Sequence, residues 1–417
     1  MGAQQKLVSL DDGFERAQRG NLIYAEILAR LTLQRDPSNL SALNLLGFVA
    51  VRAGLIGSAY EIFRRAQAAW PQAGLEATVA RLEPMLSAWR ARRAKWRKEE
   101  RFLLIKAWGY GFGADMVHVM GGLLLAELTE RTPIIHWGPN SLYSDGTAAN
   151  AFHYFFEPFN TLGLDDLRPV AARGVFPDKW HTENLQVEDL NKLEGPGSRI
   201  GPIYFLDRDE PLAVFDFFGW PIDLIGWIPE GHSYHGMNVG EIYRALWAKY
   251  LKPTRRVLDR VERFASKYWP RGQVLAVHVR DGDHRYEQHE LLDVNAQYFD
   301  IVDRLLAEQP ASIYLMTDTT TVIDAFRARY GDLVFVTNAQ RTADDTGIHY
   351  NAKADRVELG VDLLSDVLLA TRADRFVGNG RSNPSCMVWN AKAWPPGSAE
   401  LIVPCFYDEQ SPFWYDY

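Results

Sequence analysis

The sequence predicts an α/β protein in which two parallel-sheet domains follow an all-helical region. Three observations support this prediction. Residues 1–98 show helical patterns only, strands alternate with helices from Arg101 onward, and a second alternating series begins near Gln273. Such alternation is typical of doubly wound parallel sheets. We therefore expect three domains, at 1–98, 99–265 and 266–417, of which the last two are Rossmann-like and enclose a cleft.

The helical region contains an internal repeat. Ala25 and Pro37 recur as Ala59 and Pro71, each 34 residues later, which is the tetratricopeptide period. A repeat cannot bury its apolar face alone, so we expect a third helix from about Leu75 to cap the stack and the region to bind a partner protein or a second copy of the chain. The second copy carries residues typical of this repeat at its signature positions: Leu43, Leu46, Gly47, Ala50, Ala59, Phe63, Ala66 and Pro71.

Each predicted sheet domain has its own series of elements. The first series has strands at 102–108 and 133–137 around a helix at 115–130. The second begins with the strand at 274–279, a near-continuous apolar run of the kind found in strands buried on both faces. Its later strands are expected at 313–317, 333–337 and 375–378, and its helices at 296–308, 321–330 and 359–373.

Composition limits the function classes. With 45 Lys and Arg against 53 Asp and Glu, the chain has a net charge of −8, which argues against a nucleic-acid partner. Cys386 and Cys405 are too few for a disulfide framework and fit a reducing compartment. We find neither a signal-peptide core nor an apolar run of bilayer length, and therefore expect a cytoplasmic protein without a membrane span.

The strand at 274–279 leads into a loop that carries His278, Arg280, Asp281 and Asp283. Ligands of open α/β sheets bind at the carboxyl ends of the strands, and the planar guanidinium of Arg280 matches a phosphate group. The loop therefore indicates a phosphorylated ligand. A structural ion pair would explain the arginine equally well.

A glycine-rich turn joins the first strand of the first domain to its helix. Gly109, Gly111, Gly113 and Ala114 formally match the dinucleotide fingerprint. The second strand, however, ends at His136 and lacks the acid that would bind the ribose of a nicotinamide cofactor. We therefore disfavour a dehydrogenase and retain a turn that brings a phosphate or sugar close to a helix N-terminus. The alternative to a ligand-binding role is that these glycines serve only to make the tight turn between strand and helix.

Two acidic patterns suggest metals but specify none. His289 and Glu290 begin a zinc-protease motif, yet Asp293 occupies the position of its second histidine. Asp207 and Asp209 form an Asp-x-Asp pair, a pattern that occurs by chance in a chain with 53 acids. We therefore predict no metal site.

Polar residues gather at the later strand ends of the second domain. Thr317 and Asp318 end one strand, Asp362 and Asp366 lie four apart on one helix face, and the polar loop 379–385 follows the last predicted strand. With Arg280, they place a cation, hydroxyls, amides and carboxylates at successive strand ends. A nucleoside diphosphate site needs this combination of groups.

Several longer motifs resemble the α1,6-fucosyltransferases, most closely the bacterial nodulation enzymes that fucosylate chito-oligosaccharides; similar loops occur in protein O-fucosyltransferases. The resemblance covers about residue 101 to the end. The motifs are GFGADM at 111–116, NAFHYFFEPFN at 150–160, HVRDGD at 278–283, MTD at 316–318, HY at 349–350 and LLSDVLLATRADRFVGNGRSNPS at 363–385.

The resemblance implies a GT-B fold, GDP-fucose as the donor, inversion at the sugar carbon and no metal or other cofactor. By position, it implies that Arg280 binds the diphosphate beside His278. The core fucosyltransferases have a lysine and a glutamate downstream of this arginine, where His284 and Gln288 stand here, so Glu287 or Glu290 is the expected catalytic base. The chain departs from the family at Asp281, where many members have a second arginine or a histidine. The residues expected to bind the donor are Gly111, Gly113, His278, Arg280, Asp318, His349, Tyr350, Asp366, Ser382 and Asn383.

Three functional hypotheses follow. The first is a glycosyltransferase that uses a GDP-fucose-type donor and a glycan or protein acceptor. The second is a non-catalytic adaptor whose repeats bind a partner. A nicotinamide-dependent enzyme is the third.

Overall fold

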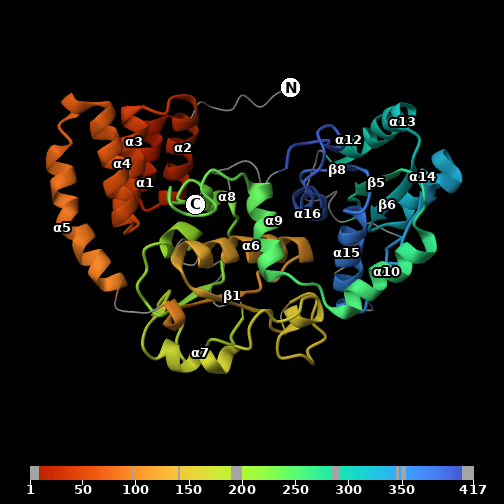
Figure 1. Cartoon of the computed structure of the whole chain (residues 1–417), viewed down its shortest axis with the longest axis horizontal. Coiled ribbons are helices and arrows are strands. Elements are labelled where there is room, and N and C mark those ends of the chain that lie inside the picture. The colour runs from red at the N-terminus through yellow and green to blue at the C-terminus, as the bar shows by residue number, and fades with distance from the viewer. Residues whose placement is uncertain are drawn as a thin grey trace.

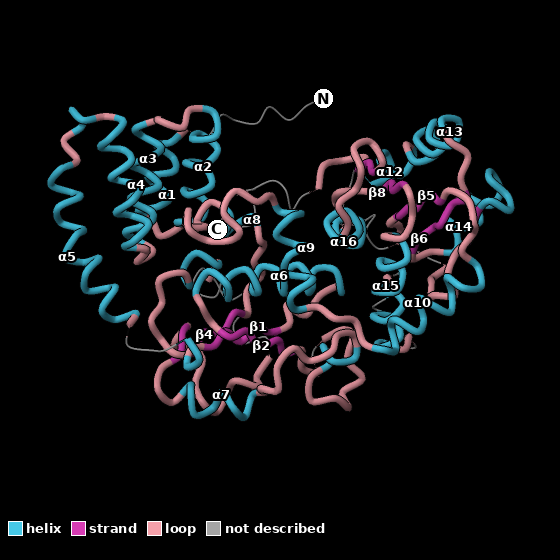
Figure 2. The backbone as a smooth tube through the Cα atoms, in the orientation of Figure 1, coloured by secondary structure: helices cyan, strands magenta, loops and turns pink. Residues whose placement is uncertain are grey.

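The structure is a computed structural model that describes residues 9–94, 98–139, 141–188, 200–282, 291–343, 347–348 and 354–405. A helical region precedes two α/β units, each built on a parallel sheet (Figure 1). The mixed α/β class with parallel sheets is thus confirmed. Figure 2 shows the strands of each sheet at the centre of its unit, with helices and loops around them.

Five α-helices form the N-terminal region over the described residues 9–94, and each packs against the next in the chain. The second and fourth begin at Leu22 and Ile56, 34 residues apart, as the repeat requires. A β-carbon at Gly47 would lie 2.6 Å from the Phe63 ring, so the third and fourth helices approach closely there. Their assignment to the tetratricopeptide class stays a prediction. The helices are α1 (Leu10–Gln18), α2 (Leu22–Arg35), α3 (Leu40–Arg52), α4 (Ile56–Ala69) and α5 (Glu76–Arg93).

Helix α2 docks the helical region onto the first α/β unit. Arg30 donates to the carbonyl oxygen of Gly226 at 3.2 Å and lies over the Trp227 ring, 4.4 Å from its centroid. The Trp227 indole N–H donates to the Glu26 carboxylate, which Arg30 also contacts. Burial raises the pKa of Glu26, and Arg30 partly offsets that effect.

The first sheet has the strand order β2-β1-β4-β3, and all its pairs are parallel. Leu103 and Ile105 pack toward α6, whereas Leu104 belongs to the cluster that includes Leu167 of α7. The strands are β1 (Phe102–Lys106), β2 (Thr132–His136), β3 (Val175–Phe176) and β4 (Leu212–Phe215). The helices are α6 (Phe112–Thr129), α7 (Leu164–Ala171), α8 (Ile222–Ile225) and α9 (Val239–Tyr250).

Helix α6 is long and apolar enough to cross a bilayer by length and composition, but 89% of it is buried inside the protein. It lies between the sheet and the helices α8 and α9. We therefore describe α6 as the core helix of its unit.

The second sheet has the order β7-β6-β5-β8-β9, again with parallel pairs only. Helices α13 and α14 cover one face, and α10 and α15 pack together on the other. The predicted boundary at 265/266 falls inside α10. The strands are β5 (Val274–Val279), β6 (Ser312–Thr317), β7 (Val334–Phe335), β8 (Arg375–Gly378) and β9 (Ala399–Leu401). The helices are α10 (Arg255–Tyr268), α12 (Leu291–Ala296), α13 (Tyr298–Glu308), α14 (Thr320–Tyr330), α15 (Arg356–Ala370) and α16 (Asn383–Ala391).

The two α/β units contact each other through helices. Helix α16 of the second unit packs against α6 and α9 of the first. Gly360 of α15 faces the Phe155 ring, which leaves no room for a β-carbon. These contacts bring the carboxyl-end loops of the two sheets toward each other.

Candidate functional site

Arg280 and Asp318 form an ion pair at the carboxyl ends of β5 and β6. Arg280 Nη1 donates to Asp318 Oδ2, and the Asp281 amide donates to Asp318 Oδ1 at 3.1 Å. The side chains are 16% and 13% exposed, respectively. Since β5 and β6 are neighbours in the sheet, two residues predicted for one site do lie together. Asp318 orients the arginine that was predicted to meet the diphosphate.

Asp281 takes part in the internal hydrogen bonding of the loop. The residue is 4% exposed, and its Oδ2 accepts a hydrogen bond from Thr319 Oγ1 at 3.3 Å. The carboxylate that departs from the resemblance is therefore buried.

His278 joins β5 to the start of α16. Its Nδ1 lies 2.6 Å from Ser385 Oγ, which also accepts the Asn379 amide at 3.0 Å. The Ser385 hydroxyl can thus donate to Nδ1 while its oxygen accepts, an assignment that follows from the network. Tyr298 donates to the His278 carbonyl at 2.6 Å. His278 was predicted to bind the donor, and the structure places it beneath the loop that begins α16.

The N-termini of α6 and α16 meet where the two α/β units contact each other. A β-carbon at Gly113, in the first turn of α6, would lie 2.5 Å from Cβ of Asn383. Gly111 and Ser382 are the N-cap residues of the two helices. The Ser382 side chain is buried, and its Oγ makes no hydrogen bond with any described residue. Four predicted residues therefore lie at two converging helix N-termini, which attract anions.

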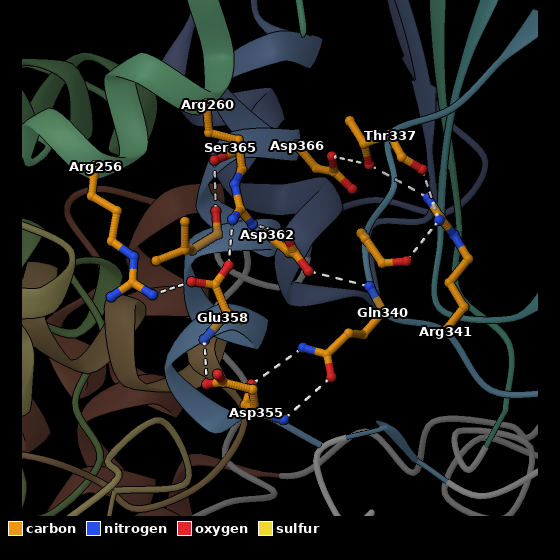
Figure 3. Close-up of polar contacts among 12 residues, drawn as sticks. Arg256, Arg260, Thr337, Gln340, Arg341, Asp355, Glu358, Asp362, Ser365 and Asp366 are labelled. Carbon is orange, nitrogen blue, oxygen red and sulfur yellow. Dashed lines mark hydrogen bonds and ion pairs between the residues drawn. The ribbon is translucent and has the colours of Figure 1, made fainter. Parts of the chain in front are cut away.

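Asp366 lies in a buried hydrogen-bond network below this edge of the sheet (Figure 3). Its Oδ1 accepts from Tyr314 OH and from Thr337 Oγ1, both at 2.8 Å. Burial raises the pKa of Asp366 to about 6. Arg341 donates to the Thr317 and Thr337 carbonyl oxygens at 3.1 and 2.9 Å and so fixes the adjacent loop.

The two carboxylates predicted to share a helix face have different partners. Asp362 pairs with Arg260 of α10 and accepts the Gln340 amide at 3.2 Å (Figure 3). Arg260 also pairs with Glu358, one helical turn before Asp362. Asp362 therefore fastens α15 to α10, whereas Asp366 supports the loop after β7.

Four predicted site residues, Glu287, Glu290, His349 and Tyr350, lie outside the described residues. Their roles stay predictions. Asp209, in the rejected Asp-x-Asp pattern, pairs with Arg92 at 3.4 Å. Within the described ranges, no three His, Cys, Asp or Glu side chains gather closely enough to hold a metal ion.

A polar row at the carboxyl end of the first sheet was not predicted. Lys106 of β1 pairs in register with His136 of β2, and its Nζ donates to the Leu185 carbonyl at 2.5 Å. Burial, followed by the charge of Lys106, lowers the pKa of His136 to about 4. Lys179 and Asp216, which directly follows β4, form an ion pair of 2.6 Å. The sequence signal for this row was a charged residue at or just after the end of each apolar strand. The same signal indicated Arg280.

The chain is similar to curated relatives and to several solved structures. The chain is 24% identical to Nodulation protein Z from Bradyrhizobium diazoefficiens over 291 residues, covering 64% of this chain and 72% of the relative. The crystal structure of fucosyltransferase NodZ from Bradyrhizobium aligns with a TM-score of 0.44 and 20% identity, over 70% of this chain and 93% of the other. POFUT1 in complex with GDP-fucose aligns with a TM-score of 0.45 and 15% identity, over 73% and 98%. No family model matches the chain.

Proposed function

We propose that this protein is a glycosyltransferase of the GT-B type that transfers fucose from GDP-fucose to a glycan or protein acceptor. One observation carries the proposal: the first turns of α6 and α16 touch, and α16 follows the strand next to the one that leads into Arg280. Strands β5 and β8 are neighbours, so Arg280 and the loop that begins α16 follow adjacent strand ends. A guanidinium and two helix N-termini suit a diphosphate.

In the proposed reaction, the acceptor oxygen attacks the sugar carbon as the bond from that carbon to the diphosphate oxygen breaks. A single displacement of this kind inverts the carbon. Negative charge develops on the GDP that leaves, where Arg280 and the helix N-termini stabilise it. Glu287 or Glu290 is the proposed base that takes the acceptor proton. The charge of Arg280 and the two helix N-termini make a metal unnecessary in this scheme.

The choice of fucose and GDP rests on the resemblance of the sequence motifs and on the similarity to Nodulation protein Z. The helical region contains none of the residues assigned to the donor. We propose that it recruits the acceptor, a partner protein or a second copy of the chain. A cytoplasmic location is proposed because two cysteines are too few for a disulfide framework.

The donor proposal is tested by thermal unfolding of the purified chain with GDP, UDP and NAD. Stabilisation by GDP and not by the other two nucleotides is expected. Slow hydrolysis of GDP-fucose by the same protein then separates an enzyme from an adaptor that only binds. Stabilisation by NAD, or binding of GDP without any turnover, would reject the enzyme as proposed.

The proposal that the reaction needs no metal ion is tested separately. Transfer or hydrolysis is expected to continue in excess EDTA. If EDTA abolished turnover and manganese restored it, the metal-free scheme would be wrong. Asp207 and Asp209 would then be the first residues to substitute.

A further inference from the structure

One sequence motif is not used by the proposed donor site: the aromatic segment 150–160, which follows β2. Its first residue fastens it to that strand, since Asn150 Nδ2 donates to the Ile135 carbonyl oxygen at 2.7 Å. Phe155 and Phe156, near its middle, are both fully buried. The motif is therefore anchored on the first α/β unit, with its aromatic rings inside the protein.

Hydrogen bonds join the same motif to the chain that links the two units, between α9 and α10. The Thr254 amide donates to the Phe155 carbonyl at 2.9 Å, and the Glu157 amide donates to the Lys252 carbonyl at 2.8 Å. Thr254 Oγ1 also donates to the Tyr154 carbonyl at 3.1 Å. The linker is therefore fastened to the backbone of the motif, and Phe155 lies where the first unit leads into the second.

The Phe155 ring contacts both units. On one side it meets the ring of Phe112, the first residue of α6, edge-on at a centroid distance of 5.0 Å. On the other side it lies against α15, because a β-carbon at Gly360 would lie 2.6 Å from its Cζ atom and still closer to Cε1. Edge-to-face ring pairs are attractive, and packed interiors have little free volume to absorb movement. The ring therefore sets the spacing between α6 and α15.

The two helices that Phe155 separates carry residues assigned to the donor. Phe112 stands between Gly111 and Gly113 at the start of α6. Asp366 belongs to α15. A change in the size or position of the Phe155 ring would therefore shift donor residues of one unit relative to those of the other.

We propose that Phe155 is a positioning residue for the transfer reaction, and that its fit against Gly360 sets the alignment of the two units. This inference rests on the proposed function and adds a residue that acts through α6 and α15. A displacement of about 1 Å at the reacting atoms can cost on the order of 10² in turnover. Most residues assigned to GDP, by contrast, belong to the second unit alone. A poor fit at Phe155 should therefore lower turnover far more than it weakens GDP binding.

The test is a double-variant cycle on the full-length chain. Phe155→Leu removes the ring atoms that lie against Gly360, Gly360→Ala adds a methyl group on the opposite side of the contact, and the double variant combines both changes. The control is Phe156→Leu, which truncates an equally buried ring of the same motif. That ring packs on Phe152 at 4.9 Å and on Trp247 at 5.8 Å, both in the first unit. GDP-fucose turnover, stabilisation by GDP and urea denaturation are measured on the wild type and all four variants.

Phe155→Leu and Gly360→Ala are each expected to lower turnover by about tenfold or more, because the first leaves a gap and the second forces the units apart. In the double variant the added methyl group occupies the space of the removed ring atoms, so turnover should return to within about threefold of wild type. Phe156→Leu should lose stability as Phe155→Leu does but keep its turnover. Stabilisation by GDP should be similar in all five proteins.

Equal turnover of Phe155→Leu and Phe156→Leu, or a double variant no more active than the two single variants, would overturn the inference. Loss of GDP stabilisation by Phe155→Leu would also overturn it, because the ring would then affect donor binding rather than alignment. If the wild type neither bound GDP nor turned over GDP-fucose, the proposed function would be wrong. The urea midpoints would then decide the contact itself: non-additive shifts in the cycle would support the fit between Phe155 and Gly360, and additive shifts would reject it.

Discussion

Gly113 and Asn383 come from different α/β units and touch at the first turns of their helices. A β-carbon at Gly113 would lie 2.5 Å from Asn383 Cβ and 3.4 Å from its Cα. Carbon atoms in contact are normally separated by about 3.5–4.0 Å. Glycine is therefore required at position 113 because there is no space for a β-carbon. The conformational freedom of the glycine backbone is not the reason.

Gly113→Ala is expected to displace α6 from α16 by about 1 Å. A displacement of that size at an active site costs on the order of 10² in turnover. Overpacking is also expected to lower the free energy of unfolding by about 1–3 kcal/mol. GDP-fucose turnover and urea denaturation of the variant measure the two effects.

The control is Gly111→Ala, two residues earlier. No atom lies within 4 Å of a β-carbon at Gly111, and its φ of −59° is ordinary for alanine. Its free energy of unfolding is expected to stay within about 0.5 kcal/mol of wild type. Equal stability of the two alanine variants would mean that the contact with Asn383 is loose in solution.

Arg280→Ala is expected to lower turnover by about 10² to 10³, the usual effect of removing a group that stabilises charge in the transition state. The ion pair with Asp318 adds a second expectation. With Arg280 removed, the Asp318 carboxylate, 13% exposed, loses its charged partner. The free energy of unfolding should therefore fall by about 1–3 kcal/mol.

The double variant Arg280→Ala/Asp318→Asn separates the two effects. Removal of the unpaired charge should recover most of the stability while turnover remains low. Urea denaturation and turnover are measured on both single variants and on the double variant. Near-normal turnover of Arg280→Ala would make the arginine a structural residue and invalidate the site assignment.

The sequence predicted buried elements best. The strand predicted at 274–279 matches β5 (Val274–Val279), because an apolar run between polar loops leaves little freedom in its bounds. The strand predicted at 333–337 is only Val334–Phe335 in the structure. It pairs on one side only, with β6, so tertiary pairing rather than local pattern sets its length. The helix predicted from 359 begins at Arg356, since Asp355 caps it through the Glu358 amide.

The sequence predicted which residues belong to the site but not which of them contact one another. Charged residues at strand ends indicated Arg280 and Asp318, yet their contact depends on β5 and β6 being neighbours in the sheet. The contact between Gly113 and Asn383 depends on how two units pack. No local pattern reports that arrangement. For Lys106, His136 and Asp216, each position at or just after a strand end was visible in the sequence, but their gathering into one row depends on the pairing of three strands.

The raised pKa of Asp366 predicts a pH-dependent stability. Its folded value of about 6 lies above the ordinary value of 3.8, so the folded state binds this proton more tightly than the unfolded state. Stability from this group is therefore lost as the pH rises from about 4 to about 6, and is constant above that range. A shift of this size corresponds to roughly 3 kcal/mol.

Asp366→Asn removes the titration and keeps an oxygen for the Tyr314 and Thr337 hydroxyls. The free energy of unfolding of the variant, relative to wild type, should therefore rise between pH 4.5 and pH 7. Thr337→Val is the control, because it removes a hydrogen bond to Asp366 without removing its charge. A difference between Asp366→Asn and wild type that does not change with pH would show that Asp366 titrates normally.

If the helical region is deleted, the surface of the first unit on which it docks must also be made polar by a substitution. Trp227 is 8% exposed, and α2 covers it through Glu26 and Arg30. Deletion of residues 1–95 would expose this indole and favour aggregation. The deletion combined with Trp227→Ser is therefore the variant to make. It is expected to remain stabilised by GDP, because the helices contain none of the residues assigned to the donor.

Modification of the native acceptor, or the oligomeric state, should change in the same truncated protein. Thermal unfolding with GDP, light scattering and transfer assays distinguish these properties. Trp227→Ser in the full-length chain is the control for the substitution itself. A truncated protein that folds, as shown by circular dichroism, but is not stabilised by GDP would mean that the helical region completes the cleft. Since α2 contacts the turn around α8, and α8 packs on the core helix α6, such a result would trace to movement of α6.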